Sequence, residues 1–223
     1  MPSYKKHALF SIVMALPFFP NVFYLALALV GASIIDMDHR VKKKNLLFMA
    51  FSGLILTLIL YILKLPFLIG VILVSLAILF YISKHRGFMH SIMGISLVTC
   101  FLGMFVLGSN ILLQDFKIDL KLSLVLISLV MGFLILNKRL LPLYSLLVTV
   151  GIILTPSMIV NPYYIFGALF VGCLSHVVLD LFTPSGVELL NPLSSKRCRK
   201  GCGLIFFGAW ILLVFVSFFY PIS

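Results

Sequence analysis

Long apolar stretches alternate with short polar or basic segments along the whole chain. The first apolar stretch covers residues 8–35 and is interrupted by the sequence PFFPN at residues 17–21. Proline fixes φ and lacks a backbone N–H, so two prolines this close together predict that one helix ends and another begins. We therefore expect a short N-terminal helical hairpin, which is either re-entrant or fully spanning.

Further apolar stretches follow at residues 46–63, 66–83, 89–108, 122–136, 140–156, 162–182 and 204–220. Most of them approach the length of about 20 residues that a helix needs to cross a hydrocarbon core. The pattern predicts an all-α fold, a polytopic transmembrane helical bundle with about 7 to 9 membrane helices including the N-terminal hairpin. We expect one integral-membrane domain over residues 1–223.

Composition and charge support a membrane protein. Of the 223 residues, 62% are hydrophobic and 10% are charged, and the mean hydropathy is +1.23. These values exclude an ordinary water-soluble domain. The net charge is +11, but the basic residues cluster between apolar stretches without interleaved aromatic residues. This distribution indicates an orientation signal and contact with anionic membrane lipids, and it argues against nucleic acid binding.

The basic segments also predict a topology. If the apolar stretches alternate across the membrane, one side receives Lys5 and Lys6 together with the segments that start at residues 39, 84, 137 and 196. The other side receives Lys64 and the loop at residues 109–119. Because basic residues favour the cytoplasm, we expect a cytoplasmic N terminus, an external C terminus and a location in the cell (inner or plasma) membrane.

Residues that can bind metal gather on this predicted cytoplasmic side. They include every histidine and four of the six acidic residues: His7, Asp36, Asp38, His39, His85, His90, His176, Asp180 and Glu188. Imidazole and carboxylate groups are common ligands of zinc and manganese. The sequence therefore predicts a metal site on one membrane face.

Three segments supply most of these side chains. The sequence DMDH covers residues 36–39, HRGFMHS covers residues 85–91, and HVVLD covers residues 176–180. His176 and Asp180 are four residues apart and share one helix face. His85 and His90 would face different ways on one helix, so we expect a turn at Gly87, before a helix that starts near His90.

Each feature alone has a simpler interpretation. A single histidine at a membrane helix end, such as His7 or His39, is more often an interfacial residue than a ligand. The HVVLD pair alone could be a buried hydrogen bond. The convergence of three segments and His7 favours a metal site over these interpretations.

The same residues resemble the YdjM-type family, a family of membrane-bound metal-dependent hydrolases. The resemblance rests on His7, on IDMDH at residues 35–39, on HRGFMHS at residues 85–91 and on GCLSHVVLDLFTPSGVELLNP at residues 172–192. The chain departs from the family pattern at Ile35, where proline is usual, and at Met89, where threonine is common. The resemblance covers most of the chain and implies a hydrolase.

We assign roles to the candidate residues as follows. The metal ligand candidates are His7, Asp36, Asp38, His85, His90, His176 and Asp180. They suffice for one or two divalent ions, zinc in the first place and manganese as the alternative. Asp38 is a ligand or a general base, and His39 is an outer partner or proton carrier. Arg86 is either a phosphate-binding group or an interfacial residue. Thr183 caps a helix or lines the site, and Gly186 allows a sharp turn.

We therefore expect an enzyme that hydrolyses a phosphoester of a lipid or lipid-linked substrate at the cytoplasmic membrane face. A site at this depth lets such a substrate enter laterally. One alternative is a transporter or channel for divalent cations, but transport sites usually lie near the membrane midplane. Another alternative is a non-catalytic membrane protein with a structural metal, which leaves Arg86 and the surplus of ligands unexplained.

Overall fold

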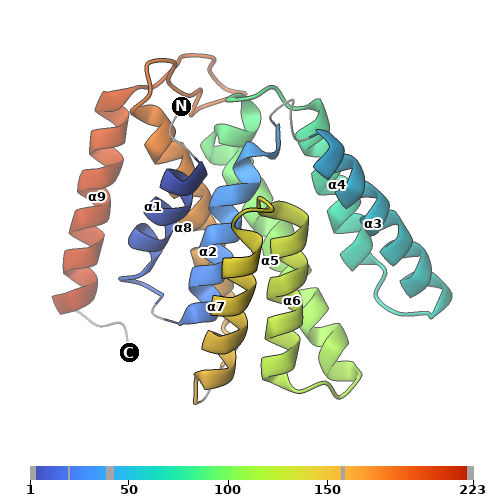
Figure 1. Cartoon of the computed structure of the whole chain (residues 1–223). Coiled ribbons are helices and arrows are strands. Elements are labelled where there is room, and N and C mark those ends of the chain that lie inside the picture. Colours follow the sequence, from blue (N-terminus) through green and yellow to red (C-terminus); the bar gives the residue numbers. More distant parts are fainter. Residues whose placement is uncertain (1–3, 20, 39–42, 157–158, 220–223) are drawn as a thin grey trace.

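The computed structural model describes residues 4–19, 21–38, 43–156 and 159–219. In this part of the chain the fold consists of nine α-helices with no strand, as the sequence predicts (Figure 1). The helices are α1 (Tyr4–Ala15), α2 (Val22–Ile34), α3 (Lys43–Ile62), α4 (Leu68–Ile82), α5 (Ile92–Asp115), α6 (Leu120–Ile135), α7 (Leu141–Leu154), α8 (Pro162–Leu181) and α9 (Lys200–Phe219). Two short 3₁₀ helices, η1 (Ile35–Asp38) and η3 (Phe88–His90), lie next to polar turns.

The predicted N-terminal hairpin is confirmed. Helix α1 ends at Ala15 and α2 starts at Val22, so the break falls on the PFFPN sequence. The Asn21 side chain accepts a hydrogen bond from the Phe23 backbone N–H at 2.9 Å and caps the start of α2. The hairpin therefore begins its second helix with a standard N-cap.

Four of the described helices, α3, α5, α8 and α9, are long and apolar enough to cross a membrane. Helices α4, α6 and α7 are apolar but shorter, with 14 to 16 residues each. The expected number of membrane crossings, seven to nine, therefore remains a prediction.

The ends of the helices explain how distant segments meet. In Figure 1, the start of α1, the ends of α2, α4 and α8, and the starts of α5 and α9 lie at the same end of the bundle. The segments with metal-capable residues lie at these helix ends. We call this end of the bundle the site end.

Helices α2 and α8 approach one another closely through glycines. A Cβ atom on Gly31 would lie 2.5 Å from the Leu169 carbonyl oxygen, and one on Gly172 would collide with the Ala28 backbone. Small residues let membrane helices pack at short range. The close packing holds the last turn of α8 against the segment that follows α2.

We expect Gly172→Ala to lower the thermal stability of the protein. Its new methyl group would overlap the Ala28 carbonyl group, and such overpacking typically costs about 1–3 kcal/mol. Gly208→Ala on α9 is the matched control, because nothing lies within 4 Å of the added Cβ. A melting curve in detergent checks both variants, and equal melting temperatures for them would contradict the close packing.

Candidate metal centre

Four separate segments bring candidate ligands to the site end. Helix α1 carries His7 near its start, and η1 carries Asp36 and Asp38 directly after α2. The turn before α5 carries His85 and His90, and the last two turns of α8 carry His176 and Asp180. His39 lies outside the described residues. The structure thus brings together the seven predicted ligands.

The turn between α4 and α5 follows the sequence prediction. The Gly87 N–H donates to the Lys84 carbonyl at 3.0 Å, and η3 follows directly. Ser91 then caps α5 by accepting a hydrogen bond from the Gly94 N–H at 3.0 Å. The helix starts at Ile92, two residues later than predicted, and the rings of His85 and His90 converge to 5.3 Å between centroids.

One group of ligands consists of His7, His176 and Asp180, all buried. His7 Nε2 lies 3.8 Å from Asp180 Oδ1, and His176 Nε2 lies 3.8 Å from Asp180 Oδ2. The two imidazole rings stack with their centroids 3.9 Å apart. Each residue can offer one ligand atom, with these atoms all within 4.8 Å of one another.

A second group consists of Asp36, His85 and His90, whose ligand atoms also all lie within 4.8 Å of one another. The two groups adjoin. His176 Nε2 of the first group lies 3.4 Å from Asp36 Oδ1, and His90 Nε2 of the second lies 3.7 Å from Asp180 Oδ2. The oxygens of Asp180 therefore face histidines of both groups.

The distances around Asp180 suit an ion between the side chains. Two ligands held about 2.0–2.2 Å from a tetrahedral zinc lie roughly 3.4 Å from each other. The contacts of Asp180 with histidines, at 3.7–3.8 Å, are near this value and longer than a direct charged hydrogen bond. His90 Nε2, His176 Nε2 and Asp180 Oδ2 are buried and have no hydrogen-bond partner among the described residues. Such atoms are costly unless something binds them, so the residues fit a divalent cation.

Asp38 has a different environment, because it contacts histidines directly. Its Oδ1 accepts a hydrogen bond from His85 Nδ1 at 2.7 Å, and its Oδ2 lies 3.2 Å from His90 Nδ1. The Asp38 side chain is fully buried. A carboxylate in this position fixes the orientation of each imidazole and directs its Nε2 away from Asp38.

The pKa values of these groups respond to burial and to one another. Burial alone would raise the pKa of Asp38, but the contacts with His85 and His90 hold it below its usual value. The hydrogen bond to Asp38 raises the pKa of His85. Burial lowers the pKa of His90, although Asp38 opposes this effect. An ionised Asp38 and a neutral His90 are the protonation states that a metal centre needs.

We expect Asp38→Asn to weaken metal binding by about 10–100-fold, as is typical when an outer partner of a ligand is changed. The amide keeps the shape of the carboxylate but loses the charge that orients two imidazoles. Competition with a metal chelator measures the affinity. Asp119→Asn is a control for charge, because Asp119 caps the start of α6 at the opposite end of the bundle. An unchanged affinity in Asp38→Asn would contradict the orienting role.

Arg86 lies beside the ligands and makes several hydrogen bonds. Its Nη2 donates to Asp180 Oδ1 at 3.2 Å, and its Nη1 donates to Thr183 Oγ1 at 3.0 Å and to Ser185 Oγ. Thr183 Oγ1 also donates to the Asp180 carbonyl at 2.7 Å and so caps α8. The backbone of Arg86 has a φ of +62°. This conformation is uncommon outside glycine and often marks functional positions.

The turn after α8 confirms the expectation for Gly186, which has a φ of +64° and approaches the Cys198 carbonyl. Glu188, another acidic residue of this end, instead accepts a hydrogen bond from Asn191 and pairs with Arg197. The sequence did not single out Ser185. In the sequence, the only indication of a role for Ser185 is that it carries a hydroxyl group two residues after Thr183, in a predicted turn.

Comparison with known proteins gives a family. The model of the YdjM inner membrane protein family matches residues 1–222. No curated protein and no solved structure matches the chain. The match covers nearly the whole chain, including all four segments of the candidate metal centre. The chain therefore belongs to the YdjM inner membrane protein family.

Proposed function

We propose that this protein is a metal-dependent hydrolase that cleaves a phosphoester of a lipid or lipid-linked substrate at the cytoplasmic face of the membrane. The observation that carries the proposal is the position of Asp180. Its carboxylate faces histidines of two ligand groups and also accepts a hydrogen bond from Arg86. Asp180 therefore belongs to the proposed cation-binding centre and also contacts Arg86, the proposed anion-binding side chain.

The proposed ligands are those of the two groups: His7, His176 and Asp180 in the first, and Asp36, His85 and His90 in the second. Nitrogen and oxygen ligands of this kind suit zinc, with manganese as the alternative, and six of them suffice for two ions. When bound, such ions would supply Lewis acidity that activates water and polarises a phosphoryl oxygen.

The residues of the chain would contribute three further functions. Asp38 orients His85 and His90, and its complete burial fits this role better than direct proton transfer to a substrate. Arg86 presents a planar guanidinium group that can hold two phosphate oxygens. Thr183 and Ser185 position this guanidinium from the turn after α8.

The substrate must reach the centre from the side that remains accessible. Among the interacting side chains, Asp36 is 22% exposed and His85 is 25% exposed, whereas His176 and Asp180 are at most 2% exposed. The centre is therefore open at η1 and at the turn before η3. Large apolar side chains are exposed over the helices, so a lipid-linked phosphoester could approach laterally from the membrane.

The hydrolysis assay compares substrates in one preparation. Purified protein is stripped of metal and reloaded with zinc or manganese, and phosphate release is measured from phosphatidic acid, from a polyprenyl phosphate and from a soluble phosphoester. We expect metal-dependent release from a lipid substrate. Cleavage of the soluble ester alone would overturn the lipid part of the proposal. Metal flux into proteoliposomes without any hydrolysis would instead support a transporter.

A further inference from the structure

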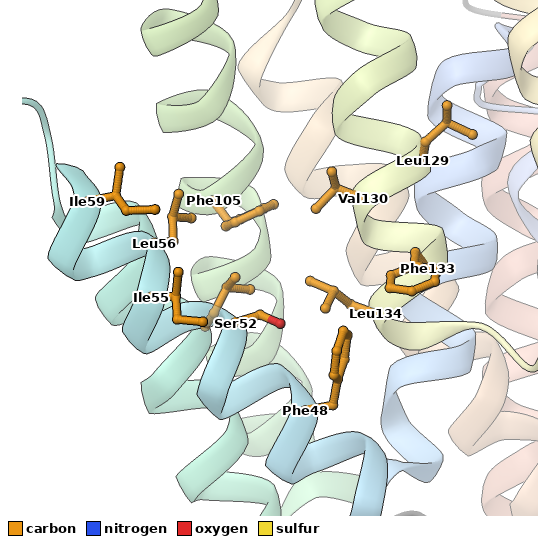
Figure 2. Close-up of a pocket in the computed structure, with 11 residues that line it drawn as sticks. Phe48, Ser52, Ile55, Leu56, Ile59, Phe105, Leu129, Val130, Phe133 and Leu134 are labelled. Atoms are coloured by element: carbon orange, nitrogen blue, oxygen red, sulfur yellow. The ribbon is translucent and has the colours of Figure 1, made fainter.

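A long apolar groove lies between α3 and α6, away from the ligand side chains. Its volume is about 530 Å³. The walls come from α3 and α6, with Phe48, Ser52 and Ile55 facing Val130 and Leu134 (Figure 2). Leu73 of α4 and Phe105 of α5, both buried, complete the lining. Ser52 is the one lining residue with a polar side chain. We call this feature the α3/α6 groove.

Along α3, its longer wall, the groove has about the length of one membrane leaflet. Its lining on α3 extends from Phe48 to Ile59, which corresponds to roughly 16 Å along a helix axis. Half of a hydrocarbon core of about 30 Å is about 15 Å. The volume also falls within the range of about 300–1,000 Å³ that is usual for ligand pockets. A single hydrocarbon chain of one leaflet therefore matches both dimensions.

Both walls end in basic residues at the same end of the groove. Lys44 lies four residues before Phe48 and so on the same face of α3, one turn beyond the groove. Lys138 and Arg139 follow the end of α6, and all three cations are exposed. The rings of Phe48 and Phe133 contact each other with centroids 5.7 Å apart, which places these wall ends together.

We propose that the α3/α6 groove binds one hydrocarbon chain of an anionic lipid, whose headgroup phosphate lies at Lys44, Lys138 and Arg139. The lipid comes from the leaflet at the site end. A second copy of this chain fits less well, because a symmetric contact would bring the same cations against each other. Lipid binding at this groove uses other residues than the metal centre and requires no turnover.

The test measures lipid binding by native mass spectrometry. Delipidated, metal-free protein in detergent is titrated with phosphatidylglycerol and with phosphatidylcholine of the same chain length. We expect a preference for phosphatidylglycerol, and we expect Lys44→Gln and Lys138→Gln to weaken its binding by about fivefold each. Binding of phosphatidylcholine should stay unchanged in both variants.

A steric variant tests the groove itself. Ser52→Phe fills the groove and should reduce binding of both lipids, whereas Ser217→Phe on the distant helix α9 should not. Val130→Phe, on the opposite wall, should reproduce the loss, and melting curves confirm that each variant is folded.

Equal lipid binding by the groove variants and the wild type would overturn the assignment. Equal affinity for the two lipids would overturn the role of the cations. A loss of dimer in Ser52→Phe would identify a second copy as the occupant. Because metal-free protein is used, none of these outcomes depends on hydrolysis.

Discussion

Asp180→Asn is expected to abolish hydrolysis and to remove most of the bound metal. The carboxylate contacts His7, His90 and His176 at 3.7–3.8 Å, so its charge faces both ligand groups. Without this charge the variant should lose several kcal/mol of transition-state stabilisation. This loss corresponds to a rate decrease of about 10³-fold or more. Phosphate release and metal content, measured on the same sample, check this expectation.

Asp115→Asn is the control for Asp180→Asn, since Asp115 is an exposed residue at the opposite end of α5. It should keep both activity and metal. The amide oxygen that Asp180→Asn introduces can still accept the hydrogen bond from Arg86, so the turn after α8 should stay in place. Full activity in Asp180→Asn would contradict the shared role of this carboxylate.

Arg86→Lys is expected to reduce kcat/KM by about 10²-fold or more while leaving the metal content unchanged. Lysine keeps the positive charge but lacks the planar fork that can bind two phosphate oxygens. It also cannot donate simultaneously to Asp180, Thr183 and Ser185 in the observed geometry. Steady-state kinetics on the proposed lipid substrate, with elemental analysis, separate these effects.

Arg197→Lys serves as the matched control, because Arg197 is 59% exposed and pairs with Glu188. We expect its kinetics to equal those of the wild type. If Arg86→Lys lost metal and activity together, Arg86 would be a structural support of the centre. If it lost neither, the phosphate-binding role would be wrong.

The sequence predicted the convergence of the ligands because two independent patterns agreed. The prolines at 17 and 20 predicted the hairpin, which places His7 and the end of α2 at one end of the bundle. The basic segments then predicted which other helix ends lie there. The structure places the seven ligand candidates close together at one end of the bundle, whereas metal binding and the side of the membrane that this end faces remain predictions.

The finer arrangement depends on contacts between distant segments, which spacing cannot predict. Asp38 was a candidate ligand or base, and only its distances to His85 and His90 indicate an orienting role. The stacking of His7 on His176 joins residues 169 positions apart in the chain. No local pattern could predict such a contact.

Helix boundaries also differed from the apolar stretches for a physical reason. The stretch at residues 89–108 predicted a helix that would end before Ser109, but α5 continues to Asp115. Asn110 is polar but buried in the bundle, so α5 continues through this residue inside the protein. Helix α3 also extends beyond its apolar stretch. It begins at Lys43, three residues before that stretch, because lysine is a good helix former.

The most direct test of the metal centre is elemental analysis of the purified wild type beside the double variant His90→Ala/His176→Ala. The double variant removes one imidazole from each ligand group, while Asp115→Ala controls for handling and charge. We predict one or two equivalents of zinc or manganese in the wild type and in Asp115→Ala, and a loss of most of this metal in the double variant. Equal metal content in all three proteins would contradict the metal centre.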